Sequence, residues 1–313
     1  MATATWTEIV AHSTGAEFRT WGKNISDNLS GTSSLLTKTA DTGQIDWATV
    51  TKPTTTNTDA GFEIYELTDS FQATSPVFIK IFYGNGGTTS RVRLKIQIGV
   101  ETDGAGAFVG LTSGEQIIAP VFNLPGTSHT SYLSINEGFV AFIWQFGGLV
   151  TNQKAFASFV LSRTSDNDGS ITGDGILVLA DSRSSNLAIA VDVLSARTLT
   201  SKTIDFLGGF INGGSTGAGQ RAFLAPSADD IATSFDGSAP QVLAGVVGIP
   251  EAFPISNLGV AINSEVTILD TVSVALAGTT ARTYRNMGLE MGKVVRAANS
   301  NAEVKYGLCI LWE

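Results

Sequence analysis

Residues 91–100 alternate between polar and apolar side chains without a break, and this pattern constrains the fold most. Every second residue is apolar: Val92, Leu94, Ile96, Ile98 and Val100. Because successive side chains of a strand point to opposite faces, a period of two predicts a half-buried β-strand. A glycine-rich turn at 84–87 separates this run from a similar one at 77–83. The two runs are therefore predicted to form an antiparallel hairpin.

Strand-like runs of similar length recur along the chain, separated by short segments rich in Gly, Asn, Asp and Pro. They are residues 116–122, 131–135, 139–146, 155–163, 175–180, 202–207, 241–247, 266–276 and 304–312. Residues 187–194 fit a strand or a helix equally well. This spacing predicts a mainly β protein, an antiparallel β-sandwich of jelly-roll type. We divide it into an N-terminal arm, helix and β domain (1–150) for anchoring and assembly, and a C-terminal β-rich domain (151–313). The last run is expected to insert into a sheet.

One segment, residues 16–30, has the period of an amphipathic helix. Its apolar side chains fall three or four positions apart on one face: Phe18, Trp21, Ile25 and Leu29. Ser13 or Thr14 is expected to cap its start, and Gly31 to end it. Such a helix usually packs on a sheet. The alternative is that these four residues, with Trp6 in the preceding arm, anchor the chain to a neighbouring subunit.

The composition is apolar for a chain with no membrane-spanning run. Charged residues make up 15% of the sequence, and the mean hydropathy is +0.18. No run approaches the roughly 18 apolar residues that a spanning helix needs, so no membrane span is predicted. Large exposed apolar patches usually mark interfaces, so we expect a homo-oligomer. The net charge of −9 is spread evenly, without a basic stripe, and therefore indicates no nucleic-acid partner.

Groups that carry reaction chemistry are scarce, and we predict neither an enzyme nor a cofactor. The chain has two histidines, His12 and His129, and one cysteine, Cys309. No Gly-x-Ser-x-Gly motif accompanies the histidines, so a hydrolase triad is not indicated. Glu63 and Glu66, three positions apart on a strand, point to opposite faces and do not form a glycosidase pair. A single cysteine forms no intrachain disulfide, which fits synthesis in a reducing cytoplasm.

Two segments resemble ligand sites. The acidic loop at 166–174 places Asp166, Asp168 and Asp174 as candidate metal ligands, but its glycine is misplaced for a calcium loop and no glutamate closes it. A turn between strands explains the same residues better. The glycine-rich segment at 208–219 lacks the Gly-Lys-Ser/Thr ending of a phosphate-binding loop.

The aromatic residues raise the question of sugar binding. Most tryptophans stand in apolar surroundings typical of a core. Trp47, beside Asp46 in a polar segment, is the best candidate for an exposed platform that contacts a glycan.

Four stretches, taken together, resemble structural proteins of tailed bacteriophages. They are Phe18-Arg19-Thr20-Trp21-Gly22 with the TADTGQIDWATV segment at 39–50, GFEIY at 61–65 with FQATSPVFIKI at 71–81, Ser162-Arg163-Thr164 with the turn that leads to Gly173-Asp174-Gly175, and the terminal Leu311-Trp312-Glu313. The resemblance implies a virion protein that is assembled in the host cytoplasm and contacts other virion proteins. It implies a place in the tail, baseplate or fibre apparatus, with three-fold or other cyclic symmetry. Capsid decoration, or a module that binds host surface glycans, is the alternative. Such proteins usually have no catalytic residues, so none is carried over.

Overall fold

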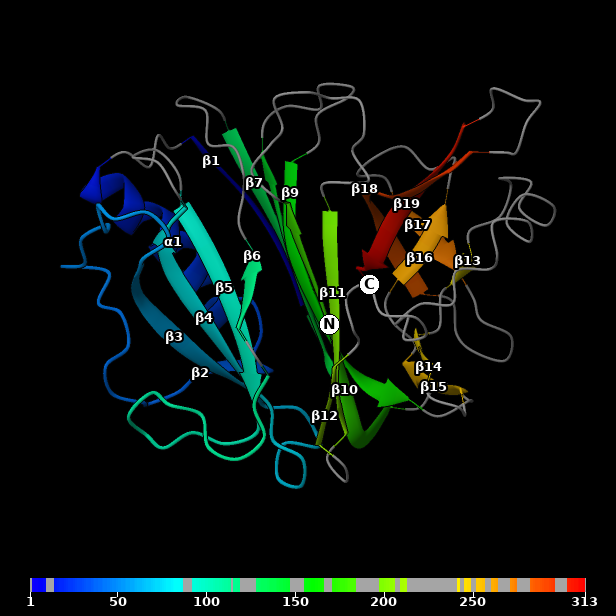
Figure 1. Cartoon of the computed structure of the whole chain (residues 1–313), viewed down its shortest axis with the longest axis horizontal. Helices are drawn as coiled ribbons and strands as arrows, with labels where there is room; N and C mark the ends of the chain where they lie inside the picture. The colour runs from blue at the N-terminus through cyan, green and yellow to red at the C-terminus, as the bar shows by residue number, and fades with distance from the viewer. Residues whose placement is uncertain are drawn as a thin grey trace.

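The structure is a computed structural model of the chain. It describes residues 2–9, 14–86, 92–113, 115–118, 128–146, 155–165, 171–183, 197–205, 209–212, 241–242, 245–248, 252–256, 260–263, 271–274, 282–295 and 303–312. Within these ranges the protein is mainly β, with antiparallel strand pairing throughout and one helix near the N-terminus (Figure 1). The predicted fold class is confirmed.

The first sheet has five strands in sequence order. They are β2 (Leu36–Lys38), β3 (Asp59–Leu67), β4 (Phe78–Asn85), β5 (Val92–Gly99) and β6 (Gln116–Ile118). The hairpin predicted from the alternation is present, because β4 and β5 pair from Phe78↔Gly99 to Asn85↔Val92 without a register shift. The apolar side chains of β5 lie in the core, as their period indicates.

The second sheet has seven strands, in the order β1-β7-β8-β9-β10-β11-β12. They are β1 (Ala2–Ile9), β7 (Ser128–Asn136), β8 (Phe139–Phe146), β9 (Ala155–Ser165), β10 (Ile171–Arg183), β11 (Arg197–Asp205) and β12 (Gly209–Asn212). Strands β8 and β9 are direct neighbours in this sheet. The boundary that we placed at residue 150 therefore separates two paired strands.

The C-terminal strands form a further five-stranded sheet and a two-stranded ribbon. The sheet order is β13 (Gln241–Val242), β16 (Val260–Asn263), β19 (Glu303–Leu311), β18 (Arg282–Val295) and β17 (Thr271–Val274), and the ribbon joins β14 (Gly245–Gly248) to β15 (Ala252–Ser256). As predicted, the last strand is inserted in a sheet, since β19 pairs with β16 on one side and β18 on the other. Residues 187–194, whose structure the sequence left open, lie outside the described residues.

Helix α1 (Gly15–Gly31) joins the first two sheets. Thr14 is the N-cap, and its side chain and that of Glu17 form a reciprocal capping box. Trp21 stacks on Trp144 of β8, with ring centroids 5.2 Å apart, and meets Tyr83 of β4 edge to face at 5.7 Å. The helix thus contributes to one core shared by both sheets.

The helical stripe is therefore a core surface, which corrects the anchor prediction. Each of its four members is at most 1% exposed: Phe18, Trp21, Ile25 and Leu29. Trp6 of β1 is half-buried and packs against Phe142, with centroids 6.1 Å apart. A neighbouring subunit cannot use these four buried side chains while the monomer keeps this fold.

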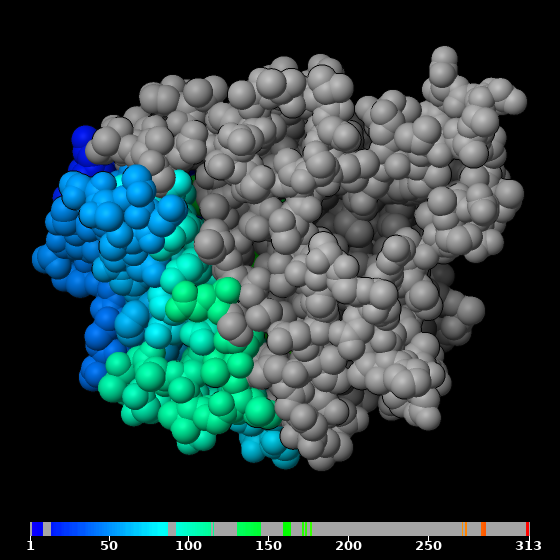
Figure 2. All heavy atoms as spheres, viewed as in Figure 1, coloured from blue at the N-terminus to red at the C-terminus, as the bar shows by residue number. Residues whose placement is uncertain are grey.

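The described surface also lacks the apolar excess that the composition suggested. In the space-filling view, the atoms coloured from blue to green lie together on the left side (Figure 2). Among the side chains that the structure describes, Val109 is the one large apolar side chain that is exposed, at 43%. An exposed apolar patch among the described side chains therefore does not explain subunit association.

Candidate functional site

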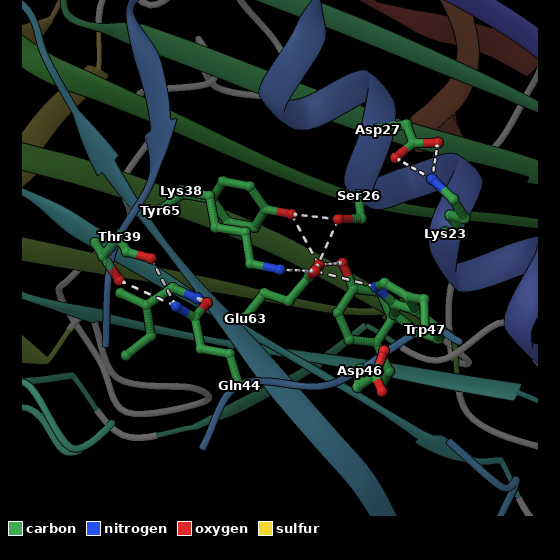
Figure 3. Close-up of polar contacts among 12 residues, drawn as sticks. Lys23, Ser26, Asp27, Lys38, Thr39, Gln44, Asp46, Trp47, Glu63 and Tyr65 are labelled. Atoms are coloured by element: carbon green, nitrogen blue, oxygen red, sulfur yellow. Dashed lines mark hydrogen bonds and ion pairs between the residues drawn. The ribbon is translucent and has the colours of Figure 1, made fainter. Parts of the chain in front are cut away.

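The most concentrated polar constellation surrounds a carboxylate in the middle of β3. Glu63 is fully buried and accepts five hydrogen bonds, most of them visible in Figure 3. Oε1 accepts from Ser26 Oγ at 2.7 Å, Lys38 Nζ at 2.6 Å and Trp47 Nε1 at 3.0 Å. Oε2 accepts from the hydroxyls of Tyr65 at 2.8 Å and Tyr83 at 2.7 Å. We call Glu63 and these five donors the Glu63 cluster.

Five different parts of the fold supply the donors. Ser26 comes from α1, Lys38 from β2 and Trp47 from the segment between β2 and β3. Tyr65 lies two residues beyond Glu63 on β3 and so shares its face. Tyr83 of β4 is two positions past Ile81, the residue that pairs with Glu63. The cluster therefore joins the helix to three adjacent strands.

The protonation states and charges of these groups stabilise the Glu63 cluster. Burial raises the pKa of the Tyr65 and Tyr83 phenols well above the usual value, and the nearby Glu63 carboxylate raises both further. Both hydroxyls therefore stay protonated and donate. The Lys38 ammonium, whose side chain is one-third exposed, balances the buried negative charge. Both carboxylate oxygens already accept hydrogen bonds, five in total, so Glu63 acts as a structural junction.

Trp47 and Asp46, the candidate glycan contacts, have different roles. The Trp47 ring is half-buried and meets Tyr83 edge to face, with centroids 4.8 Å apart, and Phe18 at 5.9 Å. Trp47 is thus a core residue, which corrects the prediction of an exposed platform. Asp46 is exposed and accepts from Ala48 N at 2.9 Å and Thr49 Oγ1 at 2.7 Å, and these bonds lower its pKa. They stabilise a turn.

The Trp47 contact depends on a glycine in the helix. A Cβ atom at Gly22 would lie 1.9 Å from Trp47 Cη2, far inside van der Waals contact. We expect Gly22→Ala to lower the free energy of unfolding by about 1–3 kcal/mol through overpacking, although alanine favours a helix by about 1 kcal/mol. Urea unfolding measures this. Gly31→Ala is the matched control, because no atom lies within 4 Å of its Cβ position. Equal stability of the two variants would contradict the predicted clash.

A second buried charge pair links the turn that follows β3 of the first sheet to the seven-stranded sheet. Asp69, in the turn after β3, and Arg163, on β9, are both fully buried at the side chain. Arg163 Nε donates to Asp69 Oδ2, and Nη2 donates to Oδ1 at 2.7 Å. The guanidinium also lies 5.4 Å from the centroid of the Phe71 ring. The two partners are 94 positions apart in the sequence, so no local sequence pattern predicts the pair.

The second face of the hairpin β4–β5 is less exposed than its polar residues suggest. Arg93 is 5% exposed and Lys95 9%, and both form ion pairs with Asp59. Lys80 Nζ donates to the Gly106 carbonyl at 2.5 Å. The prediction of a half-buried strand is therefore wrong for β5, because ion pairs allow its charged face to be buried as well.

Glu8 on β1 is a buried acid with few partners. It is 7% exposed, and its Oε1 accepts from Trp6 Nε1 at 2.8 Å. Burial raises the pKa of Glu8 to about 7, and hydrogen bonds from Trp6 and Asn24 oppose this shift only in part. The folded protein therefore holds this proton to a higher pH than the unfolded chain does.

This difference predicts a pH-dependent stability. Below pH 4.5 both states are protonated and Glu8 costs nothing. As the pH rises to about 7, the unfolded state loses its proton first, and stability falls. Glu8→Gln removes this cost, so we expect its stability gain over wild type to grow by about 2–3 kcal/mol between about pH 5 and about pH 8. Urea unfolding at both pH values checks this, with Glu101→Gln, at an exposed site, as control. Parallel pH profiles for Glu8→Gln and wild type would refute it.

Of the three candidate metal ligands, the structure describes only Asp174. Asp166 and Asp168 lie outside the described residues, and Asp174 lies on β10 where its register against β9 shifts. Among the residues that the structure describes, no group of three or more His, Cys, Asp or Glu side chains is placed to hold a metal ion. His129 of β7 pairs at the backbone with Glu8, whereas His12 is outside the described part.

Comparison with protein-family models, with curated proteins and with solved structures found no significant match to this chain. Within the described ranges, no helix combines the length and the apolar character needed to cross a membrane.

Proposed function

We propose that this chain is a non-enzymatic structural protein of a tailed-bacteriophage virion. It acts as a homo-oligomer in the tail, baseplate or fibre apparatus and contacts other virion proteins there. The proposal starts from the resemblance of its sequence strings to such proteins. Folding and assembly then take place in the host cytoplasm, and the mature location is the particle.

The observation that supports the proposal is that buried charged side chains connect separate elements of the fold. The Glu63 cluster ties α1 to β2, β3 and β4, and the pair Asp69–Arg163 ties the turn after β3 to β9. Breaking such a buried network leaves uncompensated charge, so the elements it joins are held in one arrangement. A rigid sandwich of this kind suits a building block that must present the same surface in every copy.

The proposal is tested by finding where the protein resides. Particles from cells that express the parent genome are purified and separated into heads and tails, and each fraction is analysed by mass spectrometry. We expect the chain in the tail fraction in multiple copies. Its appearance on heads would favour capsid decoration instead, and its absence from particles would refute the proposal. Binding of the purified chain to host glycans that survives loss of particle association would favour an adhesion module.

A further inference from the structure

The longest edge strand of the described sheets lacks the proline, bulge and outward charge that usually protect an edge. Strand β1 has eight residues and pairs on one side only, with β7. The other edge strands of the described sheets have two to five residues: β2, β6, β12, β13, β14, β15 and β17. Natural proteins protect long edges with proline, bulges or outward charges, because an open edge pairs readily with another chain.

Strand β1 uses none of these devices. Its register against β7 runs from Ala2↔Ile135 to Ile9↔Ser128 without a shift, so there is no bulge. It contains no proline and no basic residue, and its one charged residue, Glu8, is buried. One of its faces carries Thr3, Thr5 and Thr7, of which the last two are exposed.

The sequence of β1 is complementary to itself in antiparallel pairing. With Thr5 opposite Thr5 of a second copy, Thr3 lies opposite Thr7, Ala4 opposite Trp6, and Ala2 opposite Glu8. Threonine then pairs with threonine across one face, as Thr7 Oγ1 already does with Thr130 Oγ1 at 3.1 Å within the sheet. On the other face each large side chain meets an alanine, and no two like charges are opposed.

We propose that two copies of this chain pair through β1, antiparallel about a two-fold axis at Thr5, so that their large sheets become continuous. The inference rests on the proposed function, because it names the contact by which that protein associates. It makes a dimer the basic unit, in place of the trimer that the resemblance suggested. Main-chain hydrogen bonds supply the contact, which therefore needs no apolar patch.

The test uses charges placed on the axis. Thr5→Asp and Thr5→Lys each set two like charges opposite one another, and the exposed side chain leaves the monomer fold unchanged. Light scattering coupled to size exclusion is expected to show a wild-type dimer and at least tenfold weaker association of either variant. An equimolar mixture of the two variants should recover the dimer, because Asp then faces Lys. Thr37→Asp, an exposed threonine on edge strand β2, is the control and should leave association unchanged.

The outcomes separate the two proposals. If wild type associates and both Thr5 variants associate equally well, the β1 contact is refuted while the assembly function stands. If both variants weaken association and the mixture does not restore it, the two-fold register at Thr5 is refuted. A wild-type chain that stays monomeric at high concentration, yet is found in particles, refutes the β1 contact and leaves the virion role. Oxidation of Thr5→Cys to a disulfide-linked dimer would support the register directly, since paired Cα atoms lie within disulfide reach.

Discussion

Replacing Glu63 with glutamine is expected to lower the free energy of unfolding by about 3–5 kcal/mol, the cost typical of breaking a buried, charge-assisted network. The amide keeps the size of the side chain but loses the charge that balances Lys38. Its NH₂ group also faces donors that previously met an acceptor. All five donors of the Glu63 cluster are affected at once, because each has its bond to one of the two carboxylate oxygens.

Chemical unfolding of both proteins at the same pH measures this loss. The matched control is Glu66→Gln on the same strand, where the carboxylate is partly exposed and accepts from Gln72. This change should cost less than about 1 kcal/mol. If Glu63→Gln fails to fold, Tyr83→Phe removes a single donor and should cost about 1–2 kcal/mol. A Glu63 variant no less stable than the Glu66 variant would show that the cluster contributes nothing to stability.

Separating the buried pair Asp69–Arg163 is expected to have an effect of similar size. Arg163→Met leaves the Asp69 carboxylate fully buried without its bidentate donor, at a cost of about 3–5 kcal/mol. The loss should appear in the docking of the turn after β3 onto the seven-stranded sheet, where Ser70 N also donates to Glu137 Oε1 at 2.6 Å. Amide hydrogen exchange in residues 68–76 reports that docking.

A double-mutant cycle distinguishes pairing from simple packing. The double variant Asp69→Leu, Arg163→Met removes both charges and replaces them with apolar groups, which proteins often tolerate well. We expect it to be more stable than Arg163→Met alone and clearly more stable than the sum of the two single losses predicts. Additive losses would mean that the two side chains contribute independently, and the pair would then have no special role.

The elements that the sequence predicted well are those with a local signal. Helix α1 follows from four apolar residues at helical spacing and from the Thr14 cap, all within one short segment. The hairpin of β4 and β5 follows from alternation on both sides of a glycine-rich turn. The inserted strand β19 follows from its apolar run.

The Glu63 cluster had no such signal. In β3 the neighbouring residues Glu63 and Ile64 point to opposite faces of the sheet, yet both are fully buried. The reason is that the helix and the segment with Trp47 cover the Glu63 side. The five donors of the cluster lie between 2 and 37 positions from Glu63 in the sequence. The prediction for Trp47 was wrong for the same reason. Its neighbours in the sequence are polar, but its ring packs against Tyr83 in the core.

The pairing of β1 with β7 has a consequence for how the protein is made. Ile9 is matched to Ser128 at the nearest end of this ladder. At synthesis rates of about 5–20 residues per second, the first strand leaves the ribosome roughly ten seconds before the segment it pairs with exists. During that time its backbone is free to engage chaperones, or the emerging strand of an adjacent nascent chain.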